Sequence, residues 1–407
     1  KVPHLRLPQA MEPSKPDCKR LKKTGPDNPA SGDDLGLTWL FLDNRALTRI
    51  QATVLVLVVA VAVVGGGYYY YEATKPKPPV EMAVYAAVGE RSLLEKVAAP
   101  VFLEKYNCKL LITEGLSAEN LAKATAEKDN PVASVIQMDE GPFKQAKALG
   151  LCLKVTEKEI PTLAKIPKKF LDPDQLGVPN TLSLFGLWYD YKAFKEKGWA
   201  APSSWYDPWD PKFKGRVVLP TASSTWSYQF AMIINRLEGG TDTKWDPGFK
   251  KIKTLVPNLH SFSPRSSNTM TLVQRGEAWI GPFGIAYAFT ADREKGIPMA
   301  GVIPKEGGDF SVSWEYIPKN AKNLELAYKF VDFTMTAEYL AERFKLTYWG
   351  HPNPDVSSKL SGEFKQLYES VYDPKLLEKM WSTNWDVYAE MKDKFIERWS
   401  KEIETPA

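Results

Sequence analysis

The feature that most constrains this chain is a regular alternation of short apolar runs and amphipathic segments, which begins near Glu81. The runs "EMAVYAAV", "KLLITEG" and "ASVIQMD" are typical of strands, and each is followed by a segment with helical spacing. Strands that alternate with helices pair in parallel, because each helix carries the chain back to the same edge of the sheet. The pattern therefore predicts an α/β fold whose ligands bind at the carboxyl ends of the strands.

A second region alternates in the same way after "WYDPWDPKFKGRVVLP". Its spacing predicts a strand at 216–220, helices at 227–238 and 247–256, a strand near 259–262, a helix at 268–275 and a strand at 277–283. Between the first strand and its helix lies "TASSTW". One hydroxyl is enough to cap a helix, so four hydroxyls and a tryptophan favour ligand contact, with simple capping as the alternative.

The N-terminal part of the chain has a different character. Residues 1–44 are polar and without period, which is typical of a disordered leader. Residues 45–71 contain no charge from Ala52 to Tyr71, a length that can cross a bilayer, and a cluster of tyrosines closes the run. A buried core helix is the alternative, but the run has no polar stripe. Residues 72–80 predict a proline-rich tether.

Charge and residue usage exclude several function classes. The 53 basic and 49 acidic residues are interspersed, so no nucleic-acid partner is predicted. The three histidines and three cysteines show no metal-ligand spacing, so neither a metal nor a cofactor is expected. His260 and His351 are isolated and interpreted as structural. Cys108 and Cys152 either pair or remain buried thiols.

Three segments together carry a resemblance to a known family. They are "WYDPWDPKFKGRVVLP", "VIPKEGGDFSVSWEYIPKNAKNLELAYKFVDFTMTAEY" and "WGHPNPD", and their order and spacing matter more than any one of them. The chain resembles the solute-binding proteins of ABC importers, in the group that includes spermidine/putrescine, iron and aminoethylphosphonate binders. The match covers nearly all of residues 82–380.

The resemblance implies a two-lobed periplasmic-binding-protein clamp of the α/β class, each lobe a mostly parallel sheet flanked by helices, preceded here by one N-terminal transmembrane helix. It places lobe one at residues 81–186, lobe two at 187–308, the return to lobe one at 309–380 and C-terminal helices at 381–407. Binding would occur by closure of the two lobes around the solute.

The resemblance also places the candidate ligand contacts. They lie after the first and third strands, in the loop of lobe two and at the return crossing: Arg91, Ser92, Asp139, Glu140, Ser223, Ser224, Thr225, Trp226, Ser313, Trp314 and Glu315. Trp188 and Tyr189, at the first crossing, are expected to form a hinge or wall. A solvated Arg91, and helix capping by Asp139 and Glu140, remain open as alternatives.

Departures from the family pattern bear on the ligand. Polyamine binders carry carboxylates in the lobe-two loop and at the return crossing, because desolvated ammonium groups need counter-charge. Here the loop has no acid, and only Glu315 remains at the crossing. Iron binders use paired tyrosines, whereas "FGIAYAF" offers Tyr287 alone. Both departures disfavour those ligands.

The prediction is therefore an extracytoplasmic solute receptor, without enzymatic activity, that captures a small polar solute, for which an anionic group is one option. Its partners would be the solute, the ABC permease and the membrane that holds its N-terminal helix. If that helix is cleaved, the protein is secreted or periplasmic. A monomer is expected. A polyamine binder of the same family is one alternative. A membrane-anchored hydrolase would need a nucleophile motif that is not found. A sensory ectodomain would need an output domain, and none is recognised before the sequence ends.

Overall fold

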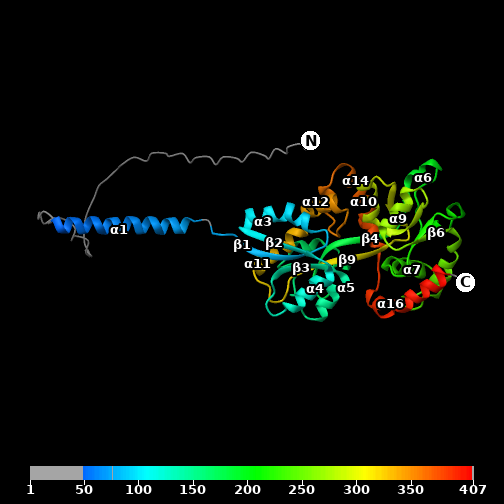
Figure 1. The fold of residues 1–407 in the computed structure, drawn as a ribbon, viewed down its shortest axis with the longest axis horizontal. Coiled ribbons are helices and arrows are strands. Elements are labelled where there is room, and N and C mark those ends of the chain that lie inside the picture. The colour runs from blue at the N-terminus through cyan, green and yellow to red at the C-terminus, as the bar shows by residue number, and fades with distance from the viewer. Residues whose placement is uncertain (1–48, 76, 406–407) are drawn as a thin grey trace, which may run out of the picture. The chain divides into compact units, whose positions relative to one another are not determined.

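The computed structural model describes residues 49–75 and 77–405, which fall into two separate units, one up to Pro76 and one from Lys77. The leader predicted over residues 1–44 lies outside the described residues. The described residues of the first unit form one continuous helix, α1 (Arg49–Thr74), which Lys75 follows (Figure 1). From Ala52 to Tyr71 its side chains are exposed, and this stretch is long and apolar enough to cross a membrane.

The second unit is built on one mixed sheet. Its strands are β1 (Val80–Ala87), β2 (Cys108–Gly115), β3 (Ala133–Asp139), β4 (Val178–Asp190), β5 (Val217–Pro220), β6 (Leu259–Ser263), β7 (Ile280–Gly284), β8 (Met299–Val302), β9 (Asp309–Tyr316) and β10 (Trp381–Ser382). The main path runs β2-β1-β3-β9-β4-β7-β5-β6, while β8 pairs with β4 and β10 with β9.

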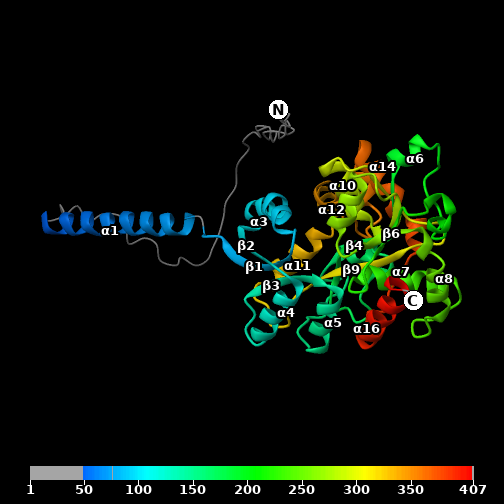
Figure 2. The ribbon, with the colours of Figure 1, turned by 45° about the vertical axis from the view of Figure 1, so that its right-hand side comes forward.

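The two ends of the sheet are parallel and its middle is antiparallel. β1 pairs in parallel with β2 and β3, and β5 pairs in parallel with β6 and β7, as the alternation of strands and helices predicts. The long strands β4 and β9 are antiparallel to each other, to β3 and to β7. They run between the two ends of the body (Figures 1 and 2). The parallel groups therefore form two lobes, and β4 and β9 cross between them.

Helices cover the sheet. They are α2 (Arg91–Leu93), α3 (Ala99–Tyr106), α4 (Ser117–Ala126), α5 (Glu140–Ala148), α6 (Tyr191–Glu196), α7 (Thr225–Leu237), α8 (Asp246–Lys253), α9 (Ser266–Gln274), α10 (Ile285–Lys295), α11 (Leu324–Thr334), α12 (Ala337–Thr347), α13 (Val356–Lys359), α14 (Gly362–Tyr372), α15 (Pro374–Glu378) and α16 (Trp385–Trp399). The predicted second-lobe helices and strands are confirmed, with ends shifted by a few residues.

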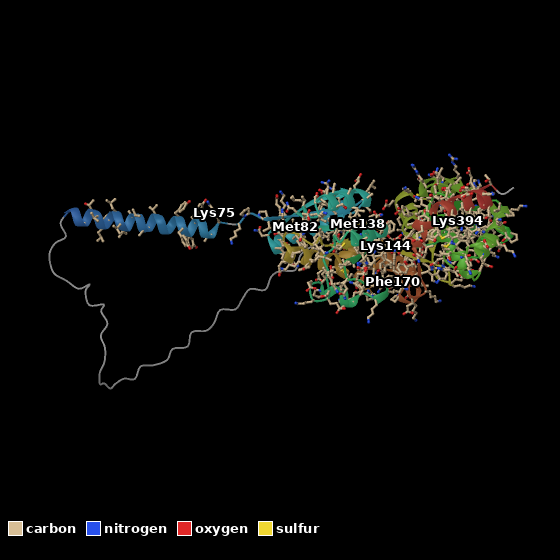
Figure 3. All side chains as sticks on the ribbon, turned by 90° about the horizontal axis from the view of Figure 1, so that it is seen from below. Lys75, Met82, Met138, Lys144, Phe170 and Lys394 are labelled. Atoms are coloured by element: carbon tan, nitrogen blue, oxygen red, sulfur yellow. The ribbon has the colours of Figure 1, made fainter. Side chains whose placement is uncertain are left out.

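Separate hydrophobic cores support the two lobes. The first core includes Met82 of β1 and Met138 of β3, which are labelled in Figure 3. Within β4 the core changes, since Leu184 belongs to the first cluster and Phe185 to the second. The residue limits of the lobes remain a proposal, which this change of core supports. The start of α10 packs in the first cluster, although the predicted limits place it in lobe two. The C-terminal segment packs in the second cluster through Phe395, Trp399 and Ile403.

His351, Cys108 and Cys152 are buried in the interior of the fold. His351 is buried; its Nε2 lies 2.9 Å from the Pro179 carbonyl, and its Nδ1 accepts a hydrogen bond from Asn353 N. Burial lowers the His351 pKa to about 3, so the ring is neutral. Cys108 and Cys152 are free and buried, so the alternative that they pair is wrong.

Candidate ligand-binding cleft

The carboxyl ends of the strands open on two neighbouring cavities. The first lies beside the ends of β5, β6 and β7, and the second lies between the ends of β1 and β3 and the crossing strands. Their volumes are about 350 and 320 Å³, which is within the range of about 300–1,000 Å³ for small-molecule sites. Trp226 and Tyr287 line both cavities, so the two spaces adjoin at these rings.

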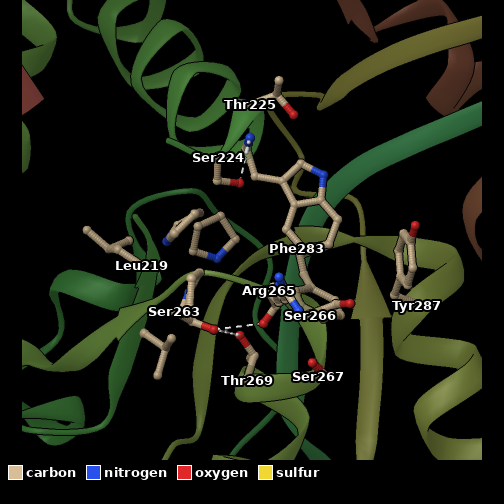
Figure 4. A pocket seen from close by; sticks show the side chains of 15 residues that line it. Leu219, Ser224, Thr225, Ser263, Arg265, Ser266, Ser267, Thr269, Phe283 and Tyr287 are labelled. Atoms are coloured by element: carbon tan, nitrogen blue, oxygen red, sulfur yellow. Dashed lines mark hydrogen bonds between the residues drawn. The ribbon is translucent and has the colours of Figure 1, made fainter. Parts of the chain in front are cut away.

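The first cavity, called here the α7–α9 cavity, lies between the starts of two helices. In Figure 4 Ser224 and Thr225 lie on one side of the space, and Ser266 and Ser267 lie on the other. The polar side chains of its lining are Ser224, Thr225, Ser263, Arg265, Ser266, Ser267 and Thr269. No carboxylate belongs to this lining among residues 77–405.

The "TASSTW" loop divides its hydroxyls between capping and the cavity. Ser224 is the N-cap of α7, and its Oγ accepts a hydrogen bond from Trp226 N at 3.2 Å. Thr225 is exposed and lines the cavity. Ser223 does not line it, and its Oγ lies 3.3 Å from Thr221 Oγ1. One hydroxyl therefore serves as the cap and at least one more faces the cavity.

The start of α9 was not singled out from the sequence. Its N-cap residue is Arg265, and no side chain caps the first turn. Ser263 Oγ donates to Arg265 O at 2.9 Å and accepts from Thr269 Oγ1 at 2.8 Å, which holds the backbone of this turn (Figure 4). In the segment "SFSPRSSNTM" a strand is followed by hydroxyl residues and then by a helix, which is the same order as around "TASSTW". The sequence therefore already contained a signal for this second loop.

The Arg265 guanidinium is exposed at this cavity. Within the described part of the chain it makes no ion pair and no hydrogen bond. Helix N-termini carry partial positive charge and free N–H groups. The α7–α9 cavity therefore combines two helix starts, several hydroxyls and an unpaired cation.

The second cavity, called here the crossing cavity, is lined by polar side chains and by aromatic rings. Its lining is Ala87, Val88, Glu90, Asp139, Asn180, Thr181, Ser183, Ser311, Ser313, Arg343 and Trp349, together with Trp226 and Tyr287. The lining comes from both crossing strands, from the ends of β1 and β3, and from α7, α10 and α12.

Asp139, Ser313 and Trp226 are the predicted contacts that line the crossing cavity, and the first two are hydrogen-bonded to each other. Asp139 accepts hydrogen bonds from Ser117 Oγ at 2.8 Å and from Ser313 Oγ at 3.1 Å. Ser117 Oγ also accepts from Asp139 N, which fixes the end of β3 against α4. Asp139 and Ser313 lie opposite each other on the paired strands β3 and β9. Their contact with a solute stays a prediction.

Aromatic rings form the wall that the two cavities share. The centroid of Trp226 lies 4.9 Å from that of Phe283 and 5.5 Å from that of Tyr287, and Tyr287 meets Trp349 at 5.6 Å. Burial and the charge of Asp139 raise the pKa of the Tyr287 phenol, so this hydroxyl remains a hydrogen-bond donor.

A buried ion pair closes the first-lobe side of the crossing cavity. Arg343 is fully buried; its Nη2 pairs with Glu90 Oε1, and its Nη1 donates to Asn180 O and, at 3.0 Å, to Asn180 Oδ1. Neither Glu90 nor Arg343 was predicted. Their 253-residue separation gives no local signal in the sequence.

Several predicted contacts lie elsewhere. Arg91 is exposed, its Nε is 2.7 Å from Glu95 Oε1, and neither Arg91 nor Ser92 lines either cavity. Glu140 lies in the first turn of α5 and is mostly buried, with its Oε1 3.9 Å from Lys144 Nζ. Burial raises the Glu140 pKa to about 7. The solvated alternative for Arg91 fits this position.

Of the three residues predicted as contacts at the return crossing, one lies at the cavity. Trp314 is buried and stacks on Phe143 at 5.0 Å. Glu315 is 1% exposed and lies beneath α11, where Thr334 Oγ1 is 3.2 Å from Oε1. Of the three predicted residues, Ser313 alone lines the crossing cavity.

The first-crossing aromatics lie in β4. Trp188 is fully buried beside Phe283, and Tyr189 packs against Phe194 at 4.8 Å. Neither lines either cavity, so a wall role has no support in this arrangement. Their position in a crossing strand leaves the hinge role as a prediction.

The chain is similar in sequence to periplasmic binding proteins and in fold to a solved ABC-transporter structure. A spermidine/putrescine-binding periplasmic protein of Escherichia coli is 29% identical over 275 residues, covering 63% of this chain and 74% of that protein. The crystal structure of an ABC transporter from Clostridium perfringens has a TM-score of 0.65 at 21% identity and covers 80% of this chain and 99% of its own. The periplasmic binding protein AfuA from Actinobacillus pleuropneumoniae, with fructose-6-phosphate bound, has a TM-score of 0.53 at 25% identity and covers 81% and 99%.

The family described as bacterial extracellular solute-binding protein matches residues 130–361, more than half of the chain. The match spans β4, α7, α9, β9 and α12, which supply most of the two cavities. The fold is the two-lobed periplasmic-binding-protein fold of these relatives. The chain therefore belongs to the bacterial extracellular solute-binding proteins, the components of ABC importers that capture a small solute outside the cytoplasm and deliver it to a permease.

Proposed function

We propose that this receptor captures a small solute that carries a phosphate, phosphonate or similar anionic group. The observation that carries the proposal is the α7–α9 cavity, where the exposed Arg265 has no partner among the described residues and α9 begins without a side-chain cap. The anionic group would lie between the starts of α7 and α9, and the rest of the solute in the crossing cavity.

The chemistry of the lining supports an anion there. Backbone N–H groups at a helix start and a guanidinium both donate to anionic oxygens, and charge-assisted hydrogen bonds are the stronger kind. The hydroxyls of Thr225, Ser266 and Ser267 add donors that can turn toward the ligand. AfuA, crystallised with fructose-6-phosphate, is a relative whose ligand has such a group.

A polyamine is the second candidate, because the Escherichia coli relative is a spermidine/putrescine-binding protein and Asp139 is an exposed carboxylate in the crossing cavity. The charge balance disfavours it. The other carboxylate of that lining, Glu90, is already paired with Arg343, and the α7–α9 cavity has no acid in the described part. A desolvated diamine would therefore lack counter-charge at one end.

We further infer that the chain acts as a membrane-anchored receptor, without catalysis and as a monomer. The apolar stretch Ala52–Tyr71 of α1 supports the anchor, and a cleaved signal segment is the alternative. For the absence of catalysis, the support is the match to a family of solute-binding transport proteins. The inference of a monomeric state is supported by the resemblance to the family alone.

Calorimetry on the full chain in detergent tests the ligand class. The panel is inorganic phosphate, fructose 6-phosphate, 2-aminoethylphosphonate and spermidine, with Arg265→Ala as the variant and Arg275→Ala, at the exposed C-terminal end of the same helix, as its control. We expect at least one anion to bind and its affinity to fall at least tenfold in Arg265→Ala alone. Tightest binding of spermidine, or equal effects of the two variants, would overturn the proposal.

A further inference from the structure

Three buried residues that line the crossing cavity, called here the polar corner, each have a polar side-chain atom without a hydrogen-bond partner among the described residues. They are Glu90, Asn180 and Arg343, which are 5%, 4% and 0% exposed. Their mutual contacts leave Glu90 Oε2, Asn180 Nδ2 and Arg343 Nε without a hydrogen-bond partner within the described chain. All three residues line the crossing cavity.

This arrangement is costly unless something completes it. A buried polar atom without a partner loses its hydration and gains nothing in return, so folded proteins keep few of them. The three residues come from the loop after β1, from β4 and from α12, so their meeting is a product of the tertiary fold rather than of one local turn. Because all three residues line one cavity, a polar group of a solute bound there is the candidate partner for these atoms.

The unpartnered atoms select a group that both donates and accepts. Glu90 Oε2 is an acceptor, whereas Arg343 Nε and Asn180 Nδ2 are donors. A neutral hydroxyl meets both needs. An ammonium group only donates, and it would also face the guanidinium of Arg343, whose charge already cancels that of Glu90.

The rest of the crossing cavity has the same character. Thr181, Ser183, Ser311 and Ser313 add hydroxyls to its lining. Trp226, Tyr287 and Trp349 add aromatic faces, against which the C–H groups of a carbon ring can pack. A lining that combines polar groups with aromatic rings suits a compact ligand that is rich in hydroxyl groups.

We infer that the crossing cavity binds the hydroxyl-rich body of a phosphorylated sugar or polyol, with the polar corner bonding its hydroxyls. The phosphate lies in the α7–α9 cavity, across the shared rings of Trp226 and Tyr287. This inference rests on the proposed function, because it assigns the body of a solute whose anionic group that proposal assigns.

Isothermal titration of the full chain in detergent tests the inference with four probes. They are fructose 6-phosphate, fructose, inorganic phosphate and 2-aminoethylphosphonate. We expect fructose 6-phosphate to bind at least tenfold more tightly than each of the other three, because it alone offers both the phosphate and the hydroxyl groups.

Two variants assign that preference to the polar corner. Asn180→Ala removes one donor, and the double variant Glu90→Gln with Arg343→Gln keeps the corner neutral and close to its original size. Each should weaken fructose 6-phosphate binding at least tenfold and change phosphate binding less than twofold, which also reports that the variant is folded. Asn130→Ala, at an exposed site away from both cavities, is the control and should change neither.

The outcomes separate this inference from the proposed function. If 2-aminoethylphosphonate binds as tightly as fructose 6-phosphate, or if the corner variants weaken both phosphate and fructose 6-phosphate equally, the hydroxyl assignment is overturned and the anion assignment stands. If none of the three anions binds, the proposed function fails. Fructose binding as tightly as its phosphate would overturn the placement of a phosphate in the α7–α9 cavity.

Discussion

Glu315 is an acid that the fold buries behind the cleft, and its protonation should control how stability depends on pH. It lies in β9, where Gln137 Nε2 donates to Oε2 at 3.4 Å and Thr334 Oγ1 lies 3.2 and 3.3 Å from the two oxygens. Burial raises the Glu315 pKa from 4.5 to about 8, although these hydrogen bonds and the charge of Arg343 act in the opposite direction.

The sign of the effect follows from proton linkage. Between pH 4.5 and pH 8 the native state holds a proton on Glu315 that the unfolded chain releases. The free energy of unfolding therefore falls as pH rises through this window, by about 1.4 kcal/mol for each pH unit. At pH 7 the accumulated loss attributable to this one group is of the order of 3 kcal/mol.

The perturbation is Glu315→Gln, which keeps the size of the side chain and cannot ionise. Relative to the wild type, the variant should gain about 2–3 kcal/mol in free energy of unfolding between pH 5 and pH 7. Urea denaturation of the full chain in detergent at both pH values, followed by tryptophan fluorescence, measures this difference. Comparing variant with wild type at each pH cancels the titration of other groups, including Asp309, whose pKa burial raises to about 6.

The control is Glu325→Gln on α11, where the carboxylate is exposed to solvent. Its effect on the free energy of unfolding should be the same at both pH values within about 0.5 kcal/mol. A Glu315→Gln effect that is equally independent of pH would mean that Glu315 is ionised in the native protein. The reasoning from burial would then be refuted.

Two further predictions concern the sheet and α1. A Cβ at Gly281 would lie 2.2 Å from Val218 O, so Gly281→Ala should lower the free energy of unfolding by about 1–3 kcal/mol. Gly141→Ala, whose Cβ meets nothing within 4 Å, is the matched control, and equal urea midpoints for the two variants would contradict the packing argument. Val61→Arg, in the apolar stretch of α1, should cost about 2.5–3.5 kcal/mol of membrane insertion and increase release by alkaline carbonate. Recovery of the wild type in the soluble fraction of a membrane preparation would contradict the anchor.

The local pattern of the sequence was sufficient for the fold class and for one part of the cleft. Helical and strand periodicity depends on nearest neighbours along the chain, so the parallel groups β1–β3 and β5–β7 were predictable. The surplus of hydroxyls in "TASSTW" was also visible, and Ser224, Thr225 and Trp226 do line a cavity. The 20-residue uncharged stretch that ends at Tyr71 forms part of a helix, as its composition indicated.

Only the tertiary structure decided which side chains face that cleft. Strand alternation puts Ser313 and Glu315 on the same face of β9, but α11 covers Glu315 and leaves Ser313 at the cavity. Arg343 meets Glu90 across 253 positions of sequence, and no periodicity in either segment encodes that meeting. Local patterns specify helices and strands, because those depend on neighbouring residues. A binding site depends on which of these elements pack together, and the whole chain determines that packing.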